Sequence, residues 1–137
     1  IREKILGPEH PDVAVSLGNL AYLYDNQGRY AEAEPLYKRS LTIYEKAFGP
    51  EHPDVAVSLN NLGGLYNKQA RYAEAERLYK RSLAIREKIL GPEHLYVALS
   101  LYNLAYLYHN QARYAEAEPP YKRSLGIRER ILGPAHL

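Results

Sequence analysis

The 137-residue sequence contains no cysteine, no methionine and no tryptophan. Without cysteine, disulfide bonds, a thiol nucleophile and thiolate metal sites are excluded. This composition suits a reducing compartment, so we expect a cytoplasmic location. No apolar run approaches the ~20 residues of a membrane-spanning helix. The first six residues also lack the apolar segment of a signal peptide.

A large charge of one sign is also absent, because 18 basic residues face 16 acidic ones and the formal net charge is +2. Bulk charge therefore does not favour nucleic-acid or membrane binding. The hydrophobic fraction of 46% is high enough for a packed core and argues against disorder. There is no phosphate-binding loop and no nucleophile at a spacing that suits a base. We therefore expect no enzymatic activity and no cofactor.

The sequence repeats itself with a period of 42 residues. The pair Gly-Pro recurs at Gly7, Gly49, Gly91 and Gly133, and the first two repeats differ at only 11 of 42 positions. A register kept this strictly predicts one unit stacked three times, in a single solenoid fragment over 1–137. The repeats are 7–48, 49–90 and 91–132. Residues 1–6 match 85–90 and are expected to end a preceding repeat, and 133–137 to start a following one.

Each repeat is expected to form two helices, in repeat one over about 11–27 and 31–48. Val13, Leu17, Leu20 and Tyr24 recur at helical spacing in the first. His10 is the predicted N-cap, with Pro11 at the first helical position and Asp12 facing the positive end of the helix dipole. Gly28 is the predicted left-handed terminator. The inner stripe of the second helix comprises Ala33, Leu36, Tyr37, Ser40, Leu41 and Ile43, and predicted i, i+4 ion pairs join Glu34–Lys38, Glu76–Lys80 and Glu118–Lys122.

The repeats depart from one another at several places that matter for the backbone. Ala70 and Ala112 replace Gly28, so those turns lack glycine. Pro119 and Pro120 fall inside a predicted helix, where they remove two donors, so we predict that this helix is kinked or starts late. Leu95 and Tyr96 replace the Pro-Asp pair of the other repeats.

The alternation of large and small residues resembles the tetratricopeptide repeat, with helices longer than in the usual 34-residue unit. Repeat one carries it as Leu17, Leu20, Ala21, Tyr24, Gly28, Tyr30, Ala33, Tyr37 and Ser40, and the other repeats keep the register. The long period is similar to that of the kinesin light chain branch. The resemblance implies an all-α fold, an α-solenoid of antiparallel helix pairs in a right-handed superhelix. It also implies that the first helices line a concave surface that holds extended peptides.

The candidate site lies on the first helices, where the repeats differ most. Asn19, Asn61 and Asn103 recur unchanged, and we expect their carboxamides to grip a peptide main chain. Gly64 falls between Tyr22 and Tyr106 of the adjacent repeats and predicts a notch for an apolar or cationic side chain. The varying positions, expected to set specificity, are Asn60, Tyr102, Asp25, Asn67, His109 and Lys68.

Other readings of these residues stay open. The asparagines can equally cap helices or bridge repeats, and the variation can reflect solvent exposure alone. The repeats can also serve as a structural spacer that self-associates end to end. RNA binding through the Lys-Arg pairs, such as Lys38–Arg39, is a third and weaker option. Glu9, His10 and Asp12 are metal-ligand types but are expected to form a helix start, and Ser40, Ser82 and Ser124 are expected in the core.

Overall fold

The computed structural model describes residues 7–133 of the chain. This part consists of α-helices, without a strand, as the sequence predicts. The segments 1–6 and 134–137, expected to belong to neighbouring repeats, lie outside the described residues. The six helices are α2 (Pro11–Asn26), α3 (Tyr30–Phe48), α4 (Pro53–Lys68), α5 (Tyr72–Leu90), α6 (Leu95–Asn110) and α7 (Tyr114–Leu132).

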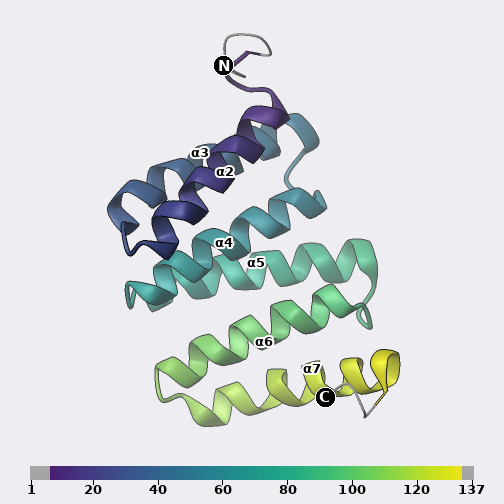
Figure 1. Cartoon of the computed structure of the whole chain (residues 1–137). Helices are drawn as coiled ribbons and strands as arrows, with labels where there is room; N and C mark the ends of the chain where they lie inside the picture. The colour runs from purple at the N-terminus through teal and green to yellow at the C-terminus, as the bar shows by residue number, and fades with distance from the viewer. Residues whose placement is uncertain (1–6, 134–137) are drawn as a thin grey trace.

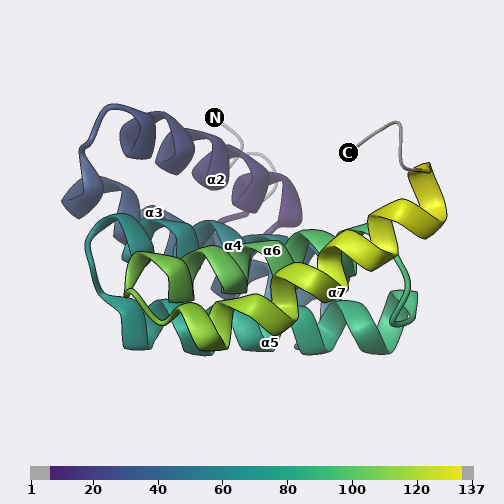
Figure 2. The same ribbon diagram turned by 90° about the horizontal axis from the view of Figure 1, so that it is seen from below.

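The helices form three antiparallel pairs that stack along one axis (Figure 1). Each helix packs on the next in the chain, and α2 also touches α4. The short turns within the pairs lie on one side of the stack and the longer joints between pairs on the other. The helix direction turns gradually from α2 to α7 when the stack is seen from below (Figure 2). The architecture is an α-solenoid in which α2, α4 and α6 are the first helices of the repeats.

The first helices begin as the sequence predicts. The Nδ1 atoms of His10, His52 and His94 each accept the backbone N–H two residues on, at 3.0 Å. This bond satisfies one of the amide donors that a helix start leaves open. The third start keeps its cap although Leu95 stands where the others have proline. The prolines therefore favour this start but are not needed for it.

The turns inside the repeats share one conformation with and without glycine. Gly28 has a φ of 75°, and Ala70 and Ala112 take the left-handed region too, at 59° and 58°. In each turn the next residue's N–H donates to a tyrosine carbonyl five residues back, as from Arg71 to Tyr66 at 2.8 Å. The surrounding bonds therefore hold an alanine where glycine is preferred.

The second helix of repeat three does not start late, so that part of the prediction is wrong, and the kink stays a prediction. The helix α7 begins at Tyr114, in register with α3 and α5, and it contains both Pro119 and Pro120. Its first turn forms before the prolines, because the Ala117 N–H donates to the Arg113 carbonyl at 3.0 Å. The missing proline donors affect only the following turn.

The predicted inner stripes form the core. In α3, Ala33, Tyr37, Ser40, Leu41 and Ile43 are buried and Leu36 is half-buried. The buried serines, confirmed as core residues, tie the two helices of a repeat together. They donate to carbonyls of the first helix at 2.8–2.9 Å, in the bonds Ser40–Ala14, Ser82–Ala56 and Ser124–Ala98.

Candidate functional site: a groove along the first helices

A groove follows the face formed by α2, α4 and α6. Two cavities of about 330 and 320 Å³ lie along it, and both are lined by Tyr22, Tyr37, Val57 and Asn61. Because they share these walls, we treat them as one groove. It runs from Asn19 of the first repeat to Asn103 of the third, so it crosses both repeat boundaries.

The three recurring asparagines all line the groove. Asn19 and Asn61 are exposed and Asn103 is half-buried. None of the three side chains forms a hydrogen bond to another residue within 7–133. In this part of the chain they therefore neither cap a helix nor bridge two repeats. Their donors and acceptors face the groove uncommitted.

Asn60 and Gly64 shape the middle of the groove. The Oδ1 atom of Asn60 is buried and has no hydrogen-bond partner within the described structure. Such an atom ordinarily finds a partner, since an unmet buried acceptor is costly. A Cβ at Gly64 would lie 3.5 Å from the Tyr79 hydroxyl, whereas one at Gly63 would lie 2.8 Å from the Tyr79 ring. Gly63 thus gives room to a core tyrosine, and Gly64 leaves its space to the groove.

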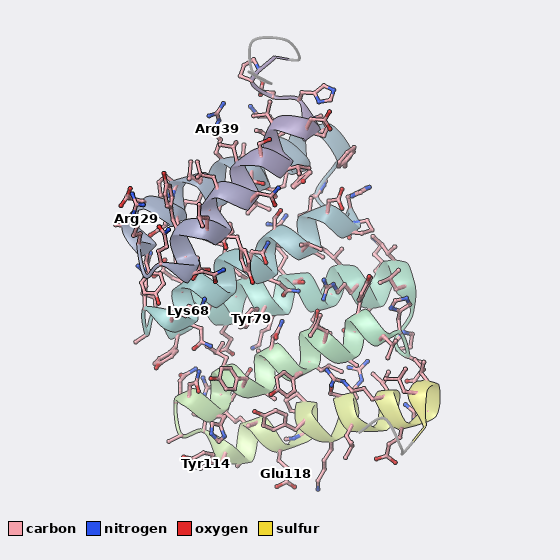
Figure 3. All side chains as sticks on the ribbon, viewed as in Figure 1. Arg29, Arg39, Lys68, Tyr79, Tyr114 and Glu118 are labelled. Atoms are coloured by element: carbon pink, nitrogen blue, oxygen red, sulfur yellow. The ribbon has the colours of Figure 1, made fainter. Side chains whose placement is uncertain are left out.

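Asp25 lies in the groove, but its carboxylate already has partners. The residue is only 5% exposed and accepts the Tyr37 hydroxyl at 3.1 Å. Lys68 reaches it across the repeat boundary, at 2.7 Å. Figure 3 places Lys68 at the end of α4, near the turn that leads to α5. Burial and the Asp25 carboxylate raise the pKa of Tyr37, so its hydroxyl stays a donor. Asp25 and Lys68 thereby join two repeats.

The remaining predicted residues lie at the third repeat. The Asn110 amide donates to Asn67 at 3.2 Å, one repeat on from the Lys68–Asp25 pair. On α6 the rings of Tyr102, Tyr106 and His109 stack in a row with centroid separations of 6.5 and 6.4 Å. Tyr102 and Tyr106 are 43% and 47% exposed. These three rings are not among the residues that line the two cavities above, and they form an exposed aromatic row on α6.

The sequence interpretation missed an ion network that joins the second helix of one repeat to the first helix and the turn of the next. Arg71 donates to Glu34 of the preceding repeat at 2.8 Å, and the Tyr66 hydroxyl donates to the same carboxylate at 3.0 Å. The guanidinium also lies over the Tyr66 ring, 4.1 Å from its centre. Burial raises the pKa of Glu34, but the bonds from Lys38, Arg71 and Tyr66 outweigh this and lower it to about 2.

The same network recurs one repeat further on, through Arg113, Tyr108 and Glu76. A sequence signal for it existed in the constant separation of 37 residues between these arginines and glutamates. The predicted i, i+4 pairs are confirmed, at 2.9 Å for Glu34–Lys38, 2.8 Å for Glu76–Lys80 and 2.7 Å for Glu118–Lys122.

The Lys-Arg pairs are engaged with carboxylates. Arg81 and Arg123 bind Glu45 and Glu87 of the preceding second helices at 2.6 and 2.7 Å. This leaves RNA binding without a supporting observation. Within 7–133, no three acidic or histidine side chains converge as metal ligands would. Among the helices of this same part, none has the length and apolarity needed to cross a bilayer.

Antiparallel helix pairs that stack along one axis, with a groove along the face of their first helices, define a helical-repeat solenoid. A family model of the tetratricopeptide repeat matches residues 1–46, 19–88 and 54–130. The chain therefore belongs to the tetratricopeptide-repeat family. Repeats of this family generally mediate protein–protein interactions and act as scaffolds rather than enzymes.

Solved structures agree with this assignment. The chain is similar to BtubC (BKLC) from P. vanneervenii, with 25% identity and a TM-score of 0.87 over 96% of this chain and 53% of that one. It is also similar to a variant of the nearly identical TPR-like repeats of a putative kinesin light chain from Podosopora anserina. There the identity is 28% and the TM-score 0.82, over 96% of this chain and 62% of that one. The chain thus spans little more than half the length of these relatives.

A third structure extends the likeness in fold. The N-terminal domain of stress-induced protein-1 from C. elegans matches with a TM-score of 0.67 and 15% identity, over 85% of each chain. No curated protein matches the sequence. The kinesin light chain likeness expected from the 42-residue period is confirmed by these neighbours.

Proposed function

We propose that the chain is a protein-interaction module that holds an extended peptide segment in the groove along α2, α4 and α6. The observation that carries the proposal is the row of three amides, Asn19, Asn61 and Asn103, on the groove wall with no hydrogen bond to the described chain. An amide offers two donors and an acceptor, the complement of a peptide unit. The asparagines recur once per repeat, so they suit an extended main chain.

Two further features support a peptide as the occupant. Asn60 is half-buried and lines the same cavity, where its carboxamide adds a further polar group on the groove wall. Gly64 and the Tyr22 ring line the same cavity. A peptide side chain of apolar or cationic type fits against this ring. The main chain would provide affinity through the amides, and the notch would select the side chain.

The test starts from a displayed random-peptide library selected on the intact chain. A selected peptide is then measured by calorimetry against a variant with Asn19→Ala, Asn61→Ala and Asn103→Ala. Because alanine favours helix over asparagine, this variant stays folded. We expect its affinity to fall at least tenfold, since each lost hydrogen bond is worth about 1 kcal/mol. The control is Thr42→Ala, on an exposed position of α3. Unchanged affinity in the triple variant would refute the groove.

A second candidate function is a spacer that stacks end to end. Leu20 and Leu23 are 39% and 51% exposed, whereas their equivalents Leu62, Leu65, Leu104 and Leu107 are at most 7% exposed. The buried leucines face the second helix of the preceding repeat. At the other end Leu125 on α7 is 46% exposed, against 9% for Leu41. The two ends therefore carry complementary halves of the interface that the inner repeats bury.

Such a contact would be head to tail and would propagate. It predicts that the molecular mass in sedimentation equilibrium rises with concentration, and that Leu23→Glu or Leu125→Glu each suppress the rise. Lys122→Ser on α7 is the matched control, because Lys122 and its equivalents Lys38 and Lys80 are exposed in every repeat. A chain that stays monomeric at millimolar concentration would rule out this function and leave the groove untouched.

A further inference from the structure

A third cavity lies between the start of α4, the end of α5 and the start of α6. Its volume is about 300 Å³, at the small end of the range for ligand sites. Val57, Ile85, Ile89 and Leu90 give it apolar walls, and Tyr96 adds an aromatic one. The Arg86 side chain enters it from α5 and also lines the groove. The cavity is therefore a mainly apolar pocket with one guanidinium group in its wall.

Arg86 is the unusual element, because its side chain is buried without a carboxylate. The residue is 6% exposed. Its Nη1 donates to the Tyr96 carbonyl at 3.2 Å and to the Ser100 hydroxyl at 3.0 Å. No acidic side chain within 7–133 lies at ion-pair distance from it. Burial lowers the pKa of this guanidinium, and a buried charge without a counter-ion is costly.

A comparison of the repeats shows how Arg86 comes to lack an acidic partner. Where repeat two has Arg86, repeat one has the neutral Tyr44. The pKa of Tyr44 is raised by burial and by the nearby carboxylates of Asp54 and Asp12. At the next boundary the equivalent of Asp54 is Tyr96. The chain thus places an arginine at the one described boundary where the following helix has lost its acid.

We propose that this cavity binds a carboxylate carried on an apolar group, with Arg86 as its ionic partner. The guanidinium has five donors, and its Nη2 and Nε atoms donate to no residue of the described chain. A carboxylate takes up two such donors side by side. The apolar part of the ligand then lies against Val57, Ile85 and Ile89. The proposal goes beyond the peptide groove, because it needs none of the groove asparagines.

Two sources share this chemistry, namely a free small acid and the terminal carboxylate of a peptide that ends in an apolar residue. Asp54 stands at the rim of the cavity, 50% exposed and 3.8 Å from His52, and it disfavours a second negative charge there. A monocarboxylate is therefore preferred to a dicarboxylate. Asp54→Asn should tighten binding of either source.

The test uses hexanoate, with hexanamide as its neutral match, and a tripeptide ending in leucine as the free acid or the amide. Binding is followed by NMR titration of the intact chain and by thermal unfolding, because a bound ligand raises the melting temperature. We expect hexanoate to bind at least about tenfold more tightly than hexanamide, as a charge-assisted bond requires. If the tripeptide acid binds and hexanoate does not, the ligand is the carboxylate end of a peptide rather than a free small acid.

Two substitutions then locate the site. Arg86→Tyr introduces the residue of repeat one, and we expect it to abolish the preference for acid over amide. Arg128→Tyr, at the same position of repeat three, is the matched control and should leave the preference unchanged. Tyr96→Asp restores the acid of the other repeats and should act as a built-in competitor that weakens hexanoate at least about tenfold. Tyr96→Asn controls for loss of the ring.

The results separate this site from the groove. The triple asparagine variant should bind hexanoate as the unaltered chain does. The proposal is overturned if neither acid binds more tightly than its amide, or if a folded Arg86→Tyr variant keeps the preference.

Discussion

Lys68 donates to the buried carboxylate of Asp25 across a repeat boundary, at 2.7 Å. The acid is 5% exposed, while the lysine side chain is 46% exposed. At the next boundary the neutral pair Asn110–Asn67 occupies the same place. The same position thus holds an ion pair at one boundary and a hydrogen bond between two side-chain amides at the other.

The first prediction concerns this pair. Within residues 7–133, Lys68→Met leaves the buried Asp25 carboxylate with only the Tyr37 hydroxyl as partner, and removing one member of a buried pair is strongly destabilising. Since Lys68 is half exposed, we discount that effect and expect a loss of about 1–3 kcal/mol in urea unfolding. The double variant Asp25→Asn with Lys68→Asn copies the next boundary and should recover part of the loss. A single variant as stable as the unaltered chain would contradict the role of this bond.

The second prediction is that the free energy of unfolding depends on pH because the pKa of Glu34 is lowered in the folded chain. The folded-state pKa of this carboxyl is lowered from 4.5 to about 2. A depressed pKa means that the unfolded chain takes up the proton first as the pH falls. The stabilisation by Glu34 is therefore full above pH 4.5 and is lost as the pH falls from there towards 2. Urea unfolding at a series of pH values measures it.

A matched pair of variants isolates this contribution. Glu34→Gln should lose stability at pH 7 and flatten the acid limb of the profile. Glu118→Gln is the control, because Glu118 holds the same place in repeat three but is exposed and, within residues 7–133, pairs with Lys122 alone. We expect it to have little effect, as for most surface ion pairs. Equal effects of both substitutions would show that the network with Arg71 and Tyr66 contributes nothing.

The fold was largely predictable because its determinants are local. The His10 cap, the left-handed Gly28 and the stripe through Ala33 and Tyr37 all lie within one repeat, where spacing translates directly into a helix face. Leu20 departs from this pattern. Its equivalents are buried by a neighbouring repeat, while Leu20 itself is exposed.

The site was predictable only in part. The groove position of Asn19 follows from its helix face, but the engagement of Asp25 depends on a contact 43 residues away. Likewise Arg86 looks like an ordinary surface residue in sequence, but in the structure it is buried and donates to Tyr96 and Ser100 of α6. Contacts between repeats depend on the superhelix, which periodicity within one repeat does not specify.

The third prediction concerns the two left-handed alanines. Ala70 and Ala112 have φ values of 59° and 58°, where a Cβ is strained and glycine is not. Ala70→Gly should therefore raise the free energy of unfolding by about 0.5–1 kcal/mol, even though it adds flexibility to the unfolded chain. The reverse change, Gly28→Ala, should lower it by a similar amount. Opposite signs would show that the neighbouring bonds, rather than this residue, determine the turn.

The last prediction separates two adjacent glycines of α4. Both are inside a helix, so alanine at either position gains about 0.8–1 kcal/mol of helix propensity. At Gly63 the new Cβ would lie 2.8 Å from the Tyr79 ring, and the ring would have to shift. Tyr79 is 5% exposed, and burial together with the Asp25 carboxylate raises its pKa to about 12. At Gly64 the nearest atom is the Tyr79 hydroxyl at 3.5 Å, an ordinary contact.

We therefore expect Gly64→Ala to stabilise the chain and Gly63→Ala to be less stable than it by at least about 1 kcal/mol, since overpacking costs that much. Gly64→Tyr introduces the tyrosine that repeats one and three carry at the equivalent positions, Tyr22 and Tyr106, and its ring fills the notch. It should keep the fold and weaken a groove-bound peptide at least about tenfold, while hexanoate binding near Arg86 stays unchanged. If peptide affinity survives Gly64→Tyr, the notch does not select the ligand's side chain, and specificity lies elsewhere along the groove.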